Sequence, residues 1–271
     1  MSKRILVCGD AMIDRYWYSD DVRVSQEAPV AIAPIVRVED RLGGAANVAL
    51  NIRAMGGDVC ALYSPSYEHD PVIKIRIISK GQQMIRADLD NAQEPVTTEQ
   101  VLAAAEMCSC VVLSDYGKGT LYNISAIIYA LKRAGKTVLV DPKGRSFNRY
   151  AEADLLKPNL AEMQKLIGGW DCEENLTYKV KALQRAAKIP TVLLTRGAQG
   201  MTLYNGEVKH IPAATGETVD VCGAGDVTLA AYATARSRGM CMIESCQVAA
   251  KAAGIAVSRF GTSLVYEKEV F

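Results

Sequence analysis

Short apolar runs alternate with amphipathic stretches along most of the chain. Buried strands are predicted at residues 4–9, 110–114, 137–141, 154–156 and 191–195, where each run is apolar and brief. Helices are predicted between or after them, at residues 98–107, 124–134, 161–167, 174–187, 225–238 and 245–259. This alternation predicts an α/β fold with a doubly wound, mostly parallel sheet and helices on both faces.

Other segments are predicted to lie outside that pattern. Residues 30–38 and 72–78 alternate more openly and are typical of half-exposed strands, so a small β lid is expected, with strands at about 12–38 and 72–90. Residues 201–211 predict a hairpin that turns at Asn205-Gly206. Neither a linker nor an internal repeat interrupts the chain, which predicts one domain over residues 1–271.

Composition and charge exclude several classes of protein. Hydrophobic residues make up 49% and the net charge is +1, so neither disorder nor a nucleic-acid partner is expected. The apolar runs are far shorter than the roughly 20 residues that span a bilayer, and the N-terminus lacks a signal-peptide core. We therefore expect a cytoplasmic protein without a membrane partner. The eight cysteines include no CxxC pair, which favours reduced core thiols over a zinc site.

The segment Asp-Val-Cys-Gly-Ala-Gly-Asp at residues 220–226 carries the clearest chemical signal. Its glycines allow close backbone approach, and the amides at the start of the following helix favour an anion. A carboxylate at Asp226, beside such a site, suits a general base that takes a proton from an attacking hydroxyl. The alternative is an ordinary acidic residue in the first turn of a helix.

Two further segments carry polar side chains at the start of a helix. Gly43 and Gly44 predict a tight turn into a helix over residues 44–55, on which Asn47 and Asn51 share one face. Asn47 there is placed to bind ligand hydroxyls, although close packing of small residues explains the segment equally well. Asn159 and Glu162 have the spacing of a capping box, and the alternative is a magnesium–nucleotide site.

The chain has neither a GxxxxGK[ST] loop nor a strand-borne GxGxxG, which disfavours P-loop ATPases and dinucleotide-binding dehydrogenases. Instead, Gly43-Gly44-Ala45-Ala46-Asn47 and residues 220–226 resemble the two signatures of the ribokinase-like (PfkB) carbohydrate kinases. Within that family, residues 9–17, 27–30, 82–83 with 86–88, 114–119 and 141–144 look most like the D-glycero-β-D-manno-heptose-7-phosphate kinases.

The resemblance implies ATP and Mg²⁺ as cofactors, a sugar-phosphate partner and a homodimer formed through the lid. It makes Asp226 the base and the amides of Gly223, Ala224 and Gly225 the anion hole. It places the remaining site residues in two groups: Asp14, Gly43, Gly44 and Asn47 around the sugar, and Asn159, Glu162, Thr195, Gly197 and Asp220 around the nucleotide, with Glu162 and Asp220 reaching the metal through water.

A sugar that carries a 7-phosphate needs cations far from the anion hole. Lys74 and Arg76 share a predicted strand face and Arg86 follows on the next strand, so these three are predicted to bind that phosphate. The alternative is a solvated lid face.

The sequence also departs from the family pattern. Only residues 64–71 separate the strand near Val59 from the lid strand, so the main sheet is expected to lack an edge strand. Val221 and Val227 replace common threonines, and Ala250 stands where an Asn often faces adenine. Phe271 is expected to lie too early for the second domain of bifunctional relatives.

These features predict an ATP-dependent kinase that converts D-glycero-β-D-manno-heptose 7-phosphate to the 1,7-bisphosphate, in lipopolysaccharide precursor synthesis. Two alternatives stay open: another sugar or nucleoside kinase of the family, and a catalytically silent regulator that binds sugar or nucleotide.

Overall fold

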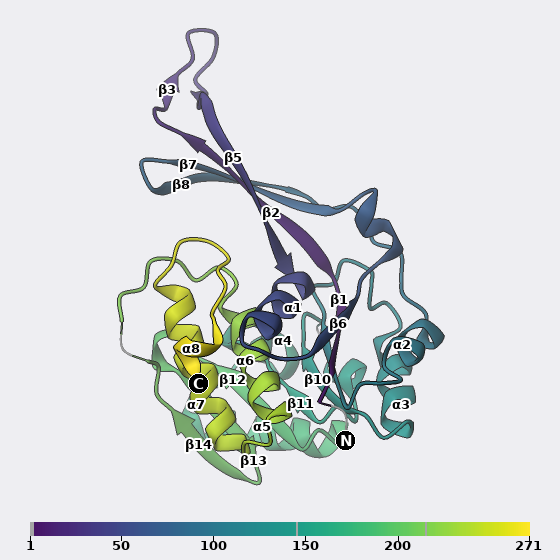
Figure 1. The fold of residues 1–271 in the computed structure, drawn as a ribbon. Coiled ribbons are helices and arrows are strands. Elements are labelled where there is room, and N and C mark those ends of the chain that lie inside the picture. The colour runs from purple at the N-terminus through teal and green to yellow at the C-terminus, as the bar shows by residue number, and fades with distance from the viewer. Residues whose placement is uncertain (1–2, 145, 215) are drawn as a thin grey trace.

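The main sheet is predominantly parallel and spans the body of the molecule (Figure 1). The computed structural model describes residues 3–144, 146–214 and 216–271. The sheet order is β14-β13-β12-β11-β10-β9-β1-β6, in which the β12–β13 and β13–β14 pairs are antiparallel and the other pairs are parallel. Its strands are β1 (Ile5–Gly9), β6 (Val59–Leu62), β9 (Cys110–Ser114), β10 (Thr137–Asp141), β11 (Leu155–Leu156), β12 (Thr191–Thr195), β13 (Met201–Asn205) and β14 (Glu207–Ile211).

Helices cover both faces of this sheet because alternate strand residues point to opposite sides. One core contains Ile5, Val7 and Val112 and packs under α1 (Ala45–Ala54), α6 (Ala224–Ser237) and α7 (Met242–Val257). The other contains Leu6 and Val111 and packs under α2 (Thr98–Ala104), α3 (Ile124–Arg133), α4 (Leu160–Ile167) and α5 (Glu173–Ala187). The predicted doubly wound α/β fold is confirmed. No helix in the described ranges is long and apolar enough to cross a membrane.

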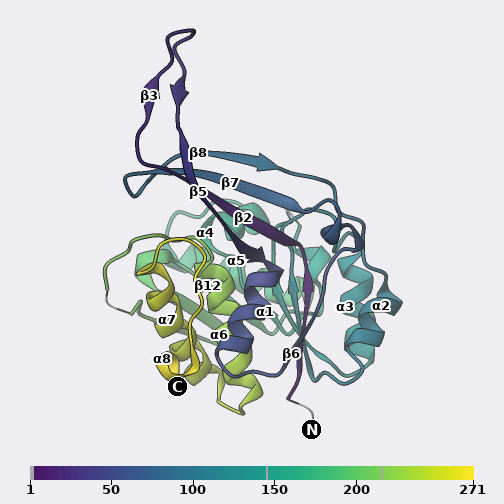
Figure 2. The same ribbon diagram turned by 45° about the horizontal axis from the view of Figure 1, so that its top comes forward.

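A second sheet forms a lid over one end of the main sheet (Figure 2). Its order is β5-β2-β7-β8, formed by β2 (Ala11–Ser19), β5 (Ile35–Gly44), β7 (Val72–Ser79) and β8 (Gln82–Leu89). The short strands β3 (Arg23–Val24) and β4 (Ala31–Ile32) extend the β2–β5 pair into a projecting arm. A 3₁₀ turn at Pro65–Glu68 leads from β6, the edge strand of the main sheet, into β7.

Most predicted elements lie within a few residues of the observed ones. The predicted strand over residues 30–38 is wrong in its extent, because β5 runs from Ile35 to Gly44 and reaches the glycine pair. Pairing with β2 sets Met12 opposite Gly43 and Ala11 opposite Gly44, so the helix α1 begins only at Ala45. The C-terminal helix α8 (Glu267–Val270) was not predicted.

All eight cysteines are free thiols. Cys8, Cys108, Cys110 and Cys246 are buried as predicted, whereas Cys172 and Cys241 are exposed. The two exposed thiols each precede a helix and therefore lie at its surface end. No group of three or more metal-ligating His, Cys, Asp or Glu side chains occurs in the part of the chain that the structure describes.

Candidate active site

The start of α6 is a glycine-bounded turn with open amides. Gly223 adopts the left-handed conformation (φ 73°), and a Cβ atom there would lie 2.8 Å from Nδ2 of Asn47. The amides of Gly223 and Gly225 have no acceptor among the described residues, whereas the Ala224 amide donates to the Val221 carbonyl at 3.3 Å. Two of the three predicted anion-hole amides are therefore free to bind an anion.

Asp226 is buried in the first turn of α6, 2% exposed. Its Oδ2 accepts a hydrogen bond from Nδ2 of Asn47 at 3.0 Å, and its Oδ1 accepts one from the Tyr116 hydroxyl at 2.6 Å. Burial raises the pKa of Asp226, while these two hydrogen bonds and the charge of Lys157 lower it. The carboxylate is thus held in a defined orientation at the end of the sheet.

Asn47 is oriented in turn by the neighbouring turn of α1. Nδ2 of Asn51 donates to Oδ1 of Asn47 at 2.9 Å, and the Val265 amide donates to Oδ1 of Asn51 at 3.0 Å. With its oxygen occupied as an acceptor, the Asn47 amide presents its NH₂ group to Asp226. The predicted shared face of Asn47 and Asn51 is confirmed, although Asn47 contacts the carboxylate rather than open space.

The glycine pair before α1 allows strand β2 to pass closely. A Cβ atom at Gly43 would lie 2.4 Å from Oδ2 of Asp14, and one at Gly44 would lie 2.3 Å from the Asp10 carbonyl oxygen. Gly44 also has φ of 57°, which disfavours other residues there. These glycines bring Asp14, Asn47 and Asp226 into one region.

The three lid cations have different partners. Arg76 forms a buried ion pair with Asp14 at 2.6 Å, with side chains 7% and 5% exposed, and Arg86 pairs with Asp88 at 2.9 Å on the exposed strand β8. Lys74 has no hydrogen bond or ion pair within the described ranges, and its ammonium lies 5.5 Å from the centre of the Tyr116 ring. Lys74 is therefore the cation that a ligand can engage without breaking an ion pair.

The Asn159–Glu162 segment is a complete capping box at the start of α4. The Glu162 amide donates to Oδ1 of Asn159 at 2.9 Å, and the Asn159 amide donates to Oε2 of Glu162 at 3.0 Å. The other oxygen, Oε1, lies 3.3 Å from Nζ of Lys143. Thr195 forms a β-bridge with Asn159, and Gly197 (φ 57°), which follows it closely in the chain, has open space where a Cβ atom would lie.

Asp220 has a different environment from the predicted one. Both its oxygens accept backbone hydrogen bonds, from the Cys222 amide at 3.0 Å and the Gly261 amide at 2.9 Å. The charge of Asp220 acts on Asp14 and Cys222, whereas that of Glu162 acts on Lys157 and Asp141. Asp220 holds the turn before α6 in shape, and the structure does not bring it together with Glu162.

A buried ion pair lies beneath the glycine turn. Nζ of Lys157 is 3.1 Å from Oδ1 of Asp141, with side chains 3% and 11% exposed. A Cβ atom at Gly225 would lie only 3.4 Å from that ammonium, so the cation approaches the backbone of the anion site. Burial raises the pKa of Asp141 to about 7, with Lys157 opposing the shift.

Residues 66–269 match the model of the pfkB family carbohydrate kinases. The chain belongs to this family. It is 37% identical over 296 residues to the D-beta-D-heptose 7-phosphate kinase of Bordetella bronchiseptica, covering 98% of this chain and 95% of that protein. It is also 39% identical over 297 residues to the bifunctional protein HldE of Shewanella piezotolerans, covering 98% of this chain but only 62% of that protein.

Solved structures share the fold of this kinase. Arabidopsis thaliana ribokinase in complex with ribose and ATP has a TM-score of 0.80 at 20% identity and covers 100% of this chain and 98% of that one. Escherichia coli phosphofructokinase-2 in complex with potassium has a TM-score of 0.81 at 17% identity, with 100% and 97% covered. At these identities the comparison shows the fold alone.

Three site residues were missed by the sequence analysis: Tyr116, Asp10 and Lys157. Asp10 follows β1, Tyr116 follows β9 and Lys157 follows β11, so all three lie at the carboxyl ends of parallel strands in the main sheet. Ligands of open α/β sheets bind at this edge. Polar residues directly after each predicted strand were therefore the available signal.

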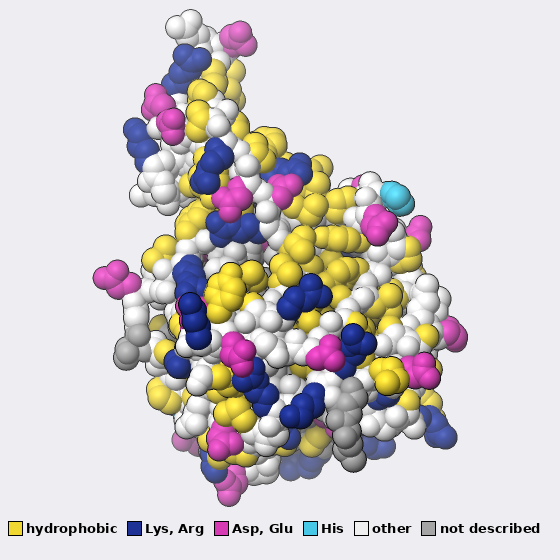
Figure 3. Space-filling view, viewed as in Figure 1, with side chains coloured by type: hydrophobic (Ala, Val, Ile, Leu, Met, Phe, Trp, Pro, Cys, Tyr) yellow, Lys and Arg dark blue, Asp and Glu magenta, His cyan; other side chains and the backbone are white. Residues whose placement is uncertain are grey.

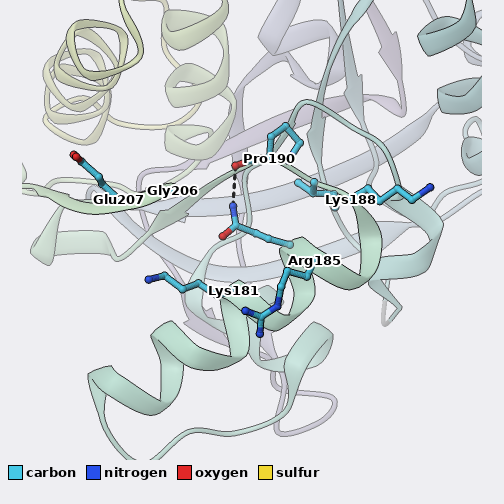
Figure 4. A pocket seen from close by; sticks show the side chains of 8 residues that line it. Lys181, Arg185, Lys188, Pro190, Gly206 and Glu207 are labelled. Atoms are coloured by element: carbon cyan, nitrogen blue, oxygen red, sulfur yellow. Dashed lines mark hydrogen bonds between the residues drawn. The ribbon is translucent and has the colours of Figure 1, made fainter.

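A separate cavity of about 600 Å³ lies away from these residues, between α5 and the β13–β14 turn (Figure 4). Its lining includes Lys181, Arg185 and Lys188, together with Glu207. None of the site residues of the kinase lines this cavity, so it is not part of the active site.

Proposed function

We propose that this kinase transfers the γ-phosphoryl group of ATP to the anomeric hydroxyl of D-glycero-β-D-manno-heptose 7-phosphate, forming the 1,7-bisphosphate. The observation that carries the proposal is the position of Asp226, a buried and oriented carboxylate beside two free backbone amides. The sugar is proposed from the full-length similarity to a D-beta-D-heptose 7-phosphate kinase. We also propose a cytoplasmic location, where ATP would be available to the enzyme.

The chemistry requires one proton transfer and one displacement. In the proposed step, Asp226 takes the proton of the sugar hydroxyl as its oxygen forms a bond to the γ-phosphorus, and the bond from that phosphorus to the β–γ bridging oxygen breaks to release ADP. The amides of Gly223 and Gly225 bind the transferring oxygens, and the nearby Lys157 ammonium adds positive charge.

The residues around Glu162 fit a magnesium ion bound through water. Mg²⁺ prefers oxygen ligands and keeps several waters, so one carboxylate near the ATP phosphates suffices. Oε1 of Glu162 accepts no hydrogen bond from the protein backbone, and its single described partner is the half-exposed Lys143. When bound, Mg²⁺ would neutralise charge on the phosphates during transfer. Asp220 remains a second, weaker proposal because backbone amides already occupy both its oxygens.

A cavity of about 480 Å³ beside α7 is proposed to hold the nucleotide base. It is lined on one side by β14 and the following residues, including His210 and Pro212, and on the other by Ile243 and Ala250 of α7. Apolar surfaces on both sides suit a flat heterocycle. Ala250 supplies no side-chain hydrogen bond there, so base selectivity would depend on other lining groups such as the Gln247 side chain.

We propose that the lid binds the 7-phosphate chiefly through Lys74. Its ammonium is unpaired in the described structure and faces the site beside Tyr116, whereas Arg76 is engaged by Asp14 and Arg86 by Asp88. Arg76 of β7 and Arg86 of β8 lie opposite each other in the lid sheet, so both are proposed as supporting cations.

The projecting arm supports the proposed homodimer. Val24, Val36 and Val38 are 73%, 60% and 55% exposed, and Figure 3 shows hydrophobic side chains along the arm. Strands β5 and β8 are the two edges of the lid sheet and leave backbone groups unpaired. Exposed apolar surface next to open strand edges favours pairing with a second copy.

Light scattering of Val36→Glu tests the dimer. The variant should be a monomer, while Val208→Glu, on the exposed face of β14 in the main sheet, should keep the mass of the native protein. A dimer in both variants would contradict pairing through the arm.

The proposed reaction is tested by coupled ADP release over a panel of sugars and sugar phosphates. The proposal expects the highest kcat/KM with the heptose 7-phosphate and a product doubly phosphorylated at carbons 1 and 7. A higher kcat/KM with an unphosphorylated sugar or a nucleoside would identify another kinase of the family. Saturable binding of sugar and ATP without ADP release would identify a silent regulator.

A further inference from the structure

Tyr116 lies where the lid, the sheet edge and α6 meet. It follows strand β9, and its hydroxyl donates to Oδ1 of Asp226 at 2.6 Å. The ammonium of Lys74, on lid strand β7, lies 5.5 Å from the centre of its ring, and the ammonium of Lys143 lies 5.9 Å from it. The phenol therefore contacts the base from the side opposite Asn47, which binds the other carboxylate oxygen.

The backbone that carries Tyr116 is fixed by a buried carboxylate. Asp10 is fully buried and accepts hydrogen bonds from the amides of Tyr116 at 2.8 Å, Lys118 at 3.0 Å and Thr120 at 3.0 Å. Three amides on one carboxylate define the path of this loop closely. The Tyr116 side chain thus reaches Asp226 from a rigid support.

A second set of hydrogen bonds ties the same loop to the neighbouring strand. Asp115 accepts from the Gly117 amide at 2.8 Å and from the Tyr150 hydroxyl at 2.8 Å. The Tyr150 oxygen in turn accepts from the amides of Lys143 and Gly144. Tyr150 therefore resembles Tyr116 in donating its hydroxyl to a carboxylate, but its acceptor is Asp115 and not the proposed base Asp226.

Opposing effects act on the pKa of Asp226. Burial and the charge of Asp14 raise it, whereas the hydrogen bonds from Tyr116 and Asn47 and the charge of Lys157 lower it. Asp141 also faces it from β10. Burial raises the pKa of Tyr116 well above its ordinary value, so the phenol keeps its proton and remains a donor.

We propose that Tyr116 is a positioning residue for the base: its hydroxyl orients the Asp226 carboxylate and keeps it ionised until the sugar hydroxyl arrives. Oδ1 of Asp226 has a second lone pair, with which it accepts the proton of the sugar while Tyr116 stays bound. The inference rests on the proposed role of Asp226 and extends it by assigning a group that orients that carboxylate.

The pH dependence of kcat in Tyr116→Phe tests this role. The variant keeps the ring near the ammonium groups of Lys74 and Lys143 and removes only the hydroxyl donor. Without that hydrogen bond the pKa of Asp226 rises, so the acidic limb of the profile moves to higher pH and the rate deficit grows as pH falls. At the plateau, the rate should fall by less than the roughly 10²-fold that loss of a general base costs.

Tyr150→Phe is the matched control, since it removes a buried tyrosine hydroxyl that binds Asp115. It should lower the melting temperature and leave the acidic limb where it is in the native enzyme. The melting temperature of Tyr116→Phe, measured alongside, should fall less than that of Tyr150→Phe, because the Tyr150 hydroxyl takes part in three hydrogen bonds and the Tyr116 hydroxyl in one.

Asp226→Asn, assayed in parallel, separates two kinds of failure. An inactive Asp226→Asn together with an unshifted limb in Tyr116→Phe would overturn the role of Tyr116 and leave the proposed base intact. An active Asp226→Asn would overturn both. Equal shifts of the limb in Tyr116→Phe and Tyr150→Phe would show a general structural effect and would also overturn the inference.

Discussion

Arg76 of β7 and Asp14 of β2 form a buried ion pair, 2.6 Å between Nη2 and Oδ1, in the lid sheet directly above the site. Both residues were predicted to bind the sugar, one through its phosphate. Their pairing means that each is held in place by the other, so the lid presents a neutral pair there and leaves Lys74 as its unpaired cation in the described structure.

Removing one partner of this pair should destabilise the protein. Arg76→Met leaves the Asp14 carboxylate buried without its cation, which costs about 3–5 kcal/mol. The double variant Asp14→Asn/Arg76→Met should recover much of that loss, since neither residue then carries a charge. Urea unfolding of the native protein, both single variants and the double variant measures the coupling. Additive losses would contradict a coupled pair.

Lys74 and Arg86 should differ in their effects on sugar binding. Lys74→Met keeps most of the side-chain length and removes the charge, so KM for the phosphorylated sugar should rise roughly 10- to 100-fold, the range for losing a charged hydrogen bond. Arg86→Met, on the exposed strand β8, should raise it much less, because Asp88 already engages that guanidinium. Steady-state kinetics with ATP as the second varied substrate measures both.

KM for ATP serves as the internal control of that comparison and should change little in either variant. A rise in KM for ATP equal to that for the sugar would show that Lys74 does not bind the substrate phosphate. A larger effect of Arg86→Met than of Lys74→Met would show that Arg86 of β8, rather than Lys74, is the main cation that binds the substrate phosphate.

Glu162→Gln should change the magnesium requirement without unfolding α4. The glutamine oxygen can still accept from the Asn159 amide, which preserves the capping box, and only the charge is lost. The Mg²⁺ concentration for half-maximal activity should rise, and activity of the native enzyme should vanish with EDTA and return with Mg²⁺. Asp220→Asn, whose oxygens bind backbone amides, should instead lower the melting temperature. Full activity in EDTA would contradict the metal role.

The fold was largely predictable because the strands of the main sheet are short apolar runs with helices between them. Strands β9, β10 and β12 match the predicted ranges, as does the hairpin at Asn205-Gly206. The predicted strand boundaries were wrong at β5, because long-range pairing with β2 decides how far that strand continues. Periodicity reports which residues are buried, whereas register between distant strands depends on contacts that local sequence does not contain.

The site was predictable to the extent that its residues lie in compact segments. Asp226 and its flanking glycines occupy one turn, and the capping box of Asn159 and Glu162 lies within four residues. Tyr116 contacts Asp226 from 110 positions away, and Asp10 organises the Tyr116 loop from a similar distance. Such contacts follow from the sheet order, which brings the ends of β1 and β9 together.

The central claim is that Asp226 is the catalytic base, and the kcat of Asp226→Asn tests it most directly. Asparagine preserves the shape of the side chain but cannot accept the proton, so kcat should fall by about 10²–10⁴-fold. Calorimetric affinities for sugar and ATP should change little. Because burial raises the pKa of Asp226, native activity should also decline as pH falls through that pKa and the carboxylate becomes protonated. A variant that retains more than about a tenth of the native kcat would contradict the account and place the base elsewhere.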